Sequence, residues 1–177
     1  LKEEEDVEAE MAPQKKRKDV KPERRIAIIV PYRKEMLLDD IEGQNREEHK
    51  RKFTNYMRKY VDEMKTYAKA NNDILLEVDM YIMEQEDDSK KFNRGALLNA
   101  GYDIAMKKHN YASIIFHDID ILPYVQMIPF YLRALQLDIY QKPFLHLTYK
   151  MPRYAKDESY LGGVLLVHSS FFNRING

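Results

Sequence analysis

The sequence predicts an α/β fold in which a mostly parallel sheet is flanked by helices. Apolar runs of strand length alternate along the chain with longer segments whose apolar residues recur every three or four positions. The 44% apolar and 11% aromatic content is sufficient for one core in a chain of 177 residues. With only 6 glycines and no G-x-G-x-x-G pattern, a dinucleotide-binding fold is not expected.

Residues 1–24 are expected to be a disordered charged linker or stem, and residues 25–177 the folded domain. An acidic block at residues 3–6 is followed by a basic block at residues 15–18, and apolar residues are few. Such a segment buries too little surface to offset the entropy that ordering removes. Because residue 1 is Leu and the chain stops just after a predicted short helix, we expect it to be part of a longer protein.

Two strands and one long helix are expected in the first half of the domain. Residues 26–30 form an apolar, mostly β-branched run, which predicts a buried strand ended by Pro31. A helix is expected over residues 46–70, and a second strand over residues 74–83. The helix carries one apolar stripe that should face the core, made of Phe53, Tyr56, Met57, Tyr60, Met64 and Tyr67.

The second half of the domain repeats this alternation. A charged loop at residues 84–91 leads into a helix over residues 94–108 and a third strand over residues 111–116. The remaining elements, in order, are a helix over residues 130–140, strands over residues 144–149 and 163–168, and a short helix capped by Ser169 or Ser170.

Net charge and cysteine content exclude several classes of protein. Lys and Arg total 29 and Asp and Glu also total 29, so no basic excess points to a nucleic acid partner. The absence of Cys excludes disulfides, thiolate metal sites and a cysteine nucleophile, and it fits a reducing compartment. No apolar run approaches the ~20 residues of a membrane span, so membrane attachment would need a segment outside this chain.

Two motifs follow predicted strands, where ligands bind in open α/β sheets. Pro31-Tyr32-Arg33 follows the first strand, and Asp118-Ile119-Asp120 follows the third. Two carboxylates at a sheet edge suit a hard cation such as Mg²⁺ or Mn²⁺, which would neutralise a diphosphate. The alternative is a solvated turn. His117, beside the pair, is expected to be a core or supporting group rather than a metal ligand.

Two further segments are candidates for parts of a ligand site. Phe92-Asn93-Arg94 opens the second helix, where a ring and a guanidinium would stack a base and hold a phosphate. The alternative is a capping Asn followed by a surface Arg. Gly162-Gly163 precedes a strand, which indicates either a tight bend or a close approach of backbone to a ligand.

Taken together, these segments resemble the β-1,4-galactosyltransferase family. Five motifs occur in the same order as in the family and together span residues 26–177. Two features, the apolar strand at residues 164–167 and the His before the Asp118-Ile119-Asp120 motif, are similar to those of the branch that galactosylates xylose on proteoglycan cores. The motifs are Ile28-Ile29-Val30-Pro31-Tyr32-Arg33, Phe92-Asn93-Arg94-Gly95-Ala96-Leu97-Leu98-Asn99-Ala100-Gly101-Tyr102, His117-Asp118-Ile119-Asp120-Ile121-Leu122-Pro123, Tyr160-Leu161-Gly162-Gly163-Val164 and Ile175-Asn176-Gly177.

The resemblance implies a GT-A fold and an inverting, Mn²⁺-dependent transfer of galactose from UDP-galactose to a glycan or glycoprotein, with Mg²⁺ as an alternative cation. It makes Asp120 the metal ligand and places Tyr160 and Gly163 beside the donor sugar. It also implies that the uridine diphosphate is contacted by Pro31, Tyr32, Arg33, Arg46, Phe92, Asn93, Arg94, Asp118, Ile119 and Lys150.

The chain departs from the family pattern in two places. An insertion at residues 34–44 separates Pro-Tyr-Arg from Asn45-Arg46-Glu47-Glu48-His49, so the second phosphate contact is assigned to Arg46 rather than Glu35. The family's W-G-W-G-x-E-D-D segment, which carries the catalytic base, and a later His ligand would lie beyond Gly177. The chain would then hold the donor half of the site and be inactive alone.

The sequence leaves two alternatives to galactose transfer open. The same fold accepts other UDP-sugars, such as UDP-N-acetylgalactosamine, and a non-catalytic protein that binds a UDP-sugar would share the donor motifs. Location is open as well. The resemblance implies the Golgi lumen, with an upstream membrane anchor, whereas the absence of Cys fits the cytosol.

Overall fold

The fold is taken from a computed structural model, which describes residues 24–34, 46–86, 90–148 and 161–175. Apart from Arg24 and Lys34, the expected linker at residues 1–24 and the insertion at residues 34–44 lie outside the described residues. Lys150 and Tyr160 lie outside them too, as do Asn176 and Gly177. The domain boundary near residue 25 and the roles of these residues therefore stay predictions.

Five strands form one mixed sheet in the order β2-β1-β3-β5-β4. They are β1 (Arg24–Arg33), β2 (Leu76–Gln85), β3 (Ser113–His117), β4 (Phe144–His146) and β5 (Val164–His168). β1 pairs in parallel with β2 and β3, whereas β5 runs antiparallel to both β3 and β4. The prediction of a mostly parallel sheet is thus confirmed for the first three strands and wrong for β5. The segment after β3 places β4 two positions away, and β5 fills the gap in the opposite direction.

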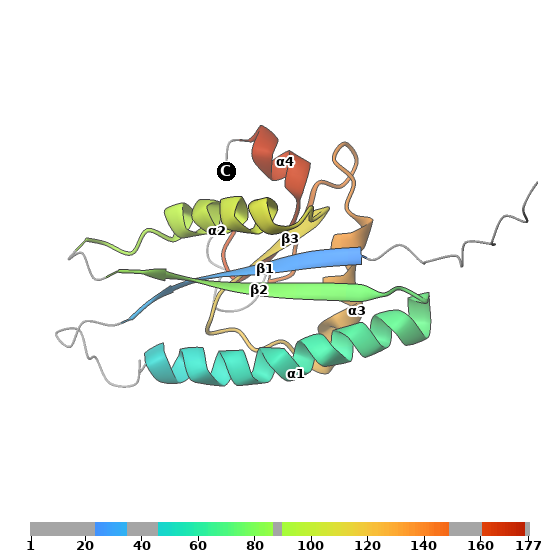
Figure 1. The fold of residues 1–177 in the computed structure, drawn as a ribbon, viewed down its shortest axis with the longest axis horizontal. Coiled ribbons are helices and arrows are strands. Elements are labelled where there is room, and N and C mark those ends of the chain that lie inside the picture. The colour runs from blue at the N-terminus through green and yellow to red at the C-terminus, as the bar shows by residue number, and fades with distance from the viewer. Residues whose placement is uncertain (1–23, 35–45, 87–89, 149–160, 176–177) are drawn as a thin grey trace, which may run out of the picture.

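Helices cover both faces of the sheet (Figure 1). On one face, α1 (Arg46–Asn72) and α3 (Ile128–Tyr131) pack on Ile26, Ile28 and Val30 of β1. On the other face, α2 (Arg94–Lys108) and α4 (Ser169–Arg174) pack on Ala27 and Ile29. The alternation of β1 side chains between two cores explains its uninterrupted apolar sequence. Among the described residues, no helix combines the length and apolarity that crossing a membrane requires.

The strand β1 continues through Pro31, contrary to the sequence prediction. Its pairing with β3 ends at Ile29, so Pro31 lies beyond the last β3 partner and is in register only with Met83 of β2. A proline is tolerated there because β1 is an edge strand at this point, with a partner on the β2 side only. β1 therefore delivers Tyr32 to the carboxyl edge of the sheet as part of the strand.

The helical predictions are confirmed for α1 and α2 and only in part for residues 130–140, which are helical as far as Gln136. In α1 the predicted stripe faces the core, with Phe53, Met57, Tyr60 and Met64 buried. The segment after β3 instead contains a 3₁₀ turn at Val125–Met127, then α3, then a second 3₁₀ turn at Leu132–Gln136. Pro129 lies in the first turn of α3, a position that needs no amide hydrogen, so helical structure begins earlier than predicted.

The cap of α4 is His168 rather than either serine. His168 Nδ1 accepts a hydrogen bond from the Ser170 amide at 3.2 Å. The Ser169 hydroxyl instead donates to the carbonyl oxygen of Tyr111, at 2.7 Å. It also lies 2.9 Å from the carbonyl oxygen of Ala112. Ser169 thereby ties the end of β5 to the chain just before β3.

Candidate functional site

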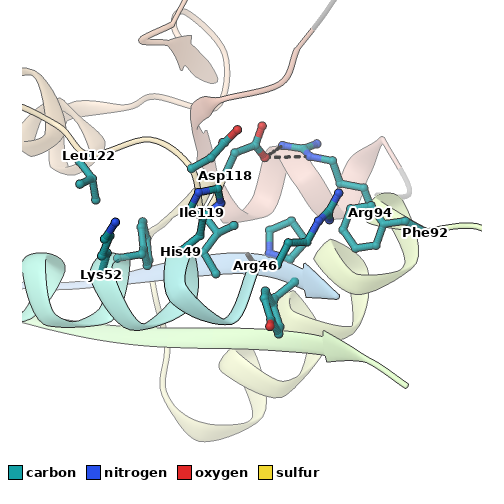
Figure 2. Close-up of a pocket in the computed structure, with 12 residues that line it drawn as sticks. Arg46, His49, Lys52, Phe92, Arg94, Asp118, Ile119 and Leu122 are labelled. Carbon is teal, nitrogen blue, oxygen red and sulfur yellow. Dashed lines mark hydrogen bonds and ion pairs between the residues drawn. The ribbon is translucent and has the colours of Figure 1, made fainter. Parts of the chain in front are cut away.

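A cleft of about 610 Å³ opens at the carboxyl ends of β1 and β3, between the first turns of α1 and α2 (Figure 2). The two motifs that follow the first and third predicted strands meet there, as expected for parallel neighbours. The first residues of the second helix and the start of α1 complete the walls. The lining residues are Pro31, Tyr32, Arg46, His49, Lys52, Phe53, Phe92, Arg94, Asp118, Ile119, Asp120 and Leu122.

Asp118 is held by two groups from distant parts of the chain. Arg94 donates from Nε and Nη2 to Asp118 Oδ1, at 3.0 and 2.9 Å. The Gly163 amide donates to the other carboxylate oxygen at 2.7 Å, and the Asp118 amide donates back to the Gly163 carbonyl at 2.8 Å. Asp118 thus joins the start of α2 to the bend before β5 and fixes the direction of the Arg94 guanidinium.

The Gly162-Gly163 segment is a tight bend, one of the two interpretations left open by the sequence. Gly163 has φ +82°, a conformation that favours glycine, and a Cβ atom there would lie 2.3 Å from Thr148 Oγ1. Any side chain at this position would displace Thr148 or the bend. The approach of this backbone to a donor sugar stays a prediction.

Asp120 differs from Asp118 in its surroundings. Asp120 is exposed and lines the cleft, whereas Asp118 is partly buried. Within the described ranges, no group of three or more His, Cys, Asp or Glu side chains is arranged to hold a metal ion. One carboxylate fits a hard cation that takes its other ligands from a bound diphosphate and from water.

His117 is a structural residue of the core. It is 0% exposed, and its Nδ1 lies 2.9 Å from the Asp118 carbonyl oxygen, which can only accept. Nδ1 therefore carries the proton, and Nε2 accepts from the Tyr131 hydroxyl at 2.8 Å. Burial lowers the pKa of His117 to about 4, so the ring is neutral. The prediction that His117 is a core or supporting group is confirmed, because the ring is buried and both of its nitrogens have partners.

The helix α1 adds two cleft residues that the sequence reasoning missed. Arg46, His49 and Lys52 are spaced three residues apart, so they share one side of the first two helical turns. In Figure 2, Arg46 lies toward Arg94, and Lys52 lies with Leu122 at the end of the cleft away from Phe92. The three-residue spacing from Arg46 is the sequence signal that could have identified His49 and Lys52 as cleft residues.

Two predicted donor contacts lie apart from the cleft lining. Arg33 donates from Nη1 to the Lys90 carbonyl oxygen, so its guanidinium braces the chain before α2. Asn93 caps α2, because its side chain accepts the Ala96 amide at 3.0 Å. The capping interpretation is therefore confirmed for Asn93, whereas Arg94 and Phe92 line the cleft.

Comparison with known proteins identifies the family of this chain. Residues 2–132 match the family model for the N-terminal region of glycosyl transferase group 7. β-1,4-Galactosyltransferase 4 of Cricetulus griseus is 31% identical over 105 residues, which cover 59% of this chain and 24% of that protein. Human β-1,4-galactosyltransferase 4 is 32% identical over 99 residues, covering 56% of this chain and 22% of that protein.

Mouse β-1,4-galactosyltransferase 6 is similar to the same extent, with 31% identity over 106 residues, or 60% of this chain and 22% of that protein. The match therefore spans less than a quarter of each of these relatives. Because the family model covers most of the chain, the resemblance seen in the motifs is confirmed. The chain belongs to glycosyl transferase group 7, the family of the β-1,4-galactosyltransferases, and residues 2–132 carry its N-terminal region.

Proposed function

We propose that the full-length protein is a galactosyltransferase that moves galactose from UDP-galactose to a sugar hydroxyl of a glycan or glycoprotein, with inversion at the anomeric carbon. The observation that carries this proposal is the cleft, where Arg46 and Arg94 from two helices lie around an exposed carboxylate, Asp120. Family membership supports galactose as the sugar. A GT-A fold agrees with the mixed sheet flanked by helices.

The cleft has the size and the groups that a nucleoside diphosphate sugar needs. Its volume of about 610 Å³ is typical of small-molecule sites. The Phe92 ring, 38% exposed, offers a stacking surface for a base. Arg46 and Arg94 offer guanidinium groups for the diphosphate. Pro31, Tyr32 and Ile119 would form its apolar walls.

Asp120 would hold Mn²⁺, or Mg²⁺, against the diphosphate. The cation would offset the negative charge that develops on the leaving UDP. This chain's residues would bind and orient the donor: Arg94 is held by Asp118, and Arg46 approaches from α1. The acceptor hydroxyl would attack the anomeric carbon in line as the bond to UDP breaks. Its proton would pass to a base that the family resemblance places beyond Gly177.

The test combines a binding and a transfer measurement. The 177-residue chain is expected to bind UDP in calorimetry when Mn²⁺ is present and to transfer nothing. The full-length protein is expected to transfer galactose from UDP-galactose to a glycan acceptor. UDP binding without transfer by the full-length protein would favour a non-catalytic binding protein. Transfer by the 177-residue chain would show that the base lies within it, and the absence of UDP binding would contradict the donor site itself.

A further inference from the structure

Two polar contacts join the first turns of α1 to the carboxyl ends of β1 and β2, beside the cleft. The Tyr32 hydroxyl donates to Glu47 Oε1 at 2.6 Å. Lys50 Nζ donates to Glu84 Oε2 at 2.7 Å. Lys50 also lies over the Tyr32 ring, 4.5 Å from its centroid, so the two contacts form one unit. These four residues are called the α1 clamp below.

The α1 clamp holds the part of the helix that supplies basic side chains to the cleft. Glu47 directly follows Arg46, and Lys50 directly follows His49, and both Arg46 and His49 line the cleft. A helical turn moves as a unit, because each residue is fixed by its neighbours' hydrogen bonds. The contacts of Glu47 and Lys50 with the strands therefore set where Arg46 and His49 enter the cleft.

The bond between Tyr32 and Glu47 is assisted by charge. Tyr32 is 1% exposed, and burial together with the bond to Glu47 raises the pKa of its hydroxyl. The same bond lowers the pKa of the Glu47 carboxyl, so the pair persists as a phenol donating to a carboxylate. A buried donor fixed to a strand end and an ionised acceptor on the helix form a directional link.

We propose that the α1 clamp is a positioning device that orients Arg46 toward the diphosphate of the donor. This inference rests on the proposed function, since it needs an anionic ligand in the cleft. Tyr32 then has two separate roles: its ring forms part of the cleft wall, and its hydroxyl fixes the position of the first turn of α1. A second ion pair between α1 and β2, Lys65 with Glu77 at 2.9 Å, lies toward the other end of the helix and serves as the comparison.

The first measurement is UDP affinity in Mn²⁺, by calorimetry on the 177-residue chain. Tyr32→Phe keeps the ring and removes the hydroxyl, and it is expected to weaken binding about three- to tenfold. Glu47→Gln, whose amide oxygen still accepts the bond, should retain more affinity than Glu47→Ala. Glu77→Gln is the matched control, with unchanged affinity. In an Arg46→Ala background Tyr32→Phe should cost nothing further, because the clamp acts through Arg46.

The second measurement needs no ligand. Amides of residues 50–53 bond to the carbonyls of the first turn, so Tyr32→Phe should speed their hydrogen exchange and leave residues 65–68 unchanged. Unchanged exchange at residues 50–53 would overturn the clamp even if UDP binds. Equal UDP affinity of wild type and Tyr32→Phe, or the same loss in the Arg46→Ala background, would also overturn it. A wild type that shows no UDP affinity would contradict the proposed function, and exchange alone would then decide the clamp.

Discussion

The amino and carboxyl ends of the sheet each carry an aspartate paired with an arginine, but the two pairs have different roles. At the amino end, Asp79 Oδ2 accepts from Arg25 Nη1 at 2.9 Å and from the Tyr111 hydroxyl at 2.6 Å. At the carboxyl end, Asp118 accepts from Arg94 and from the Gly163 amide. Each carboxylate is thus paired with one arginine and one further donor from a distant segment.

The difference lies in what surrounds each pair. The Asp79 group lies beside two aromatic side chains, since the Tyr81 and Tyr111 hydroxyls lie 2.9 Å apart and their rings pack edge to face. The Asp118 group opens onto the cleft, beside the exposed Asp120 and the basic side of α1. An arginine–aspartate pair is therefore no sign of function by itself. Its position at the carboxyl edge of the sheet, next to a cavity, distinguishes a candidate site from a structural contact.

The largest expected effect concerns Asp120. In the full-length protein Asp120→Asn should lower turnover by orders of magnitude while leaving the fold intact, because a hard cation loses its anionic oxygen ligand. Asp79→Asn, at the amino end of the sheet, should keep turnover near the wild-type value. Steady-state kinetics with UDP-galactose measure both. Full activity of the wild type in excess chelator would contradict the role of Asp120 as a metal ligand.

The next effect concerns the phosphate contact on α1. Arg46→Ala should raise the dissociation constant of UDP about ten- to a hundredfold, the loss expected for a charge-assisted hydrogen bond. Glu35→Ala should change it little, since Glu35 holds the place of the arginine only if the insertion at residues 34–44 is ignored. Calorimetry with UDP measures both variants. A large effect of Glu35→Ala and a small effect of Arg46→Ala would contradict the assignment of the phosphate contact to Arg46 and favour the alignment without the insertion.

Donor choice is expected to depend on Tyr160, which lies outside the described residues. The family resemblance implies that its ring would lie beside the C2 substituent of the sugar and fill the space that an acetamido group needs. Tyr160→Leu should therefore raise transfer from UDP-N-acetylgalactosamine by about ten- to a hundredfold. The ratio of kcat/KM for the two donors measures this. A ratio unaffected by the substitution would exclude Tyr160 from the site and leave other UDP-sugars as donors.

The smallest expected effect is on the free energy of unfolding and concerns Asp79 at the amino end of the sheet. Asp79→Asn should lower the free energy of unfolding by about 1 kcal/mol at neutral pH, a modest cost because the carboxylate is partly exposed. Burial acts against ionisation, but the bonds from Tyr111 and Arg25 prevail and lower the pKa of Asp79 below its ordinary value of 3.8.

A lowered pKa in the folded state stabilises the protein above the ordinary value, and this stabilisation is lost as the pH falls through the lowered pKa. The difference in unfolding free energy between wild type and Asp79→Asn should therefore be complete at pH 7 and shrink in acid. Denaturant unfolding at several pH values measures it. A difference that grows in acid would show that Asp79 is not stabilised as a carboxylate.

Local patterns predicted the elements whose signals are strong and continuous. The helix α2 was predicted over its full length, since Asn93 caps it and its apolar residues face one core. The helix predicted over residues 130–140 was placed too late, because helical structure begins at Val125 and ends at Gln136. Pro129 permits this early start, since a proline is favoured in a first turn. The antiparallel direction of β5 has no local signal, because an apolar strand has the same pattern in either direction.

The sequence by itself determined that the strand-end motifs share one edge of the sheet. Alternating apolar runs dictate which strands are buried, and parallel neighbours bring their carboxyl ends together. Only the tertiary structure decided how the side chains divide their roles. Arg94 and Gly163 engage Asp118, Arg33 turns toward Lys90, and α1 brings His49 and Lys52 to the cleft. These contacts join residues far apart in the chain, and local periodicity carries no information about such pairs.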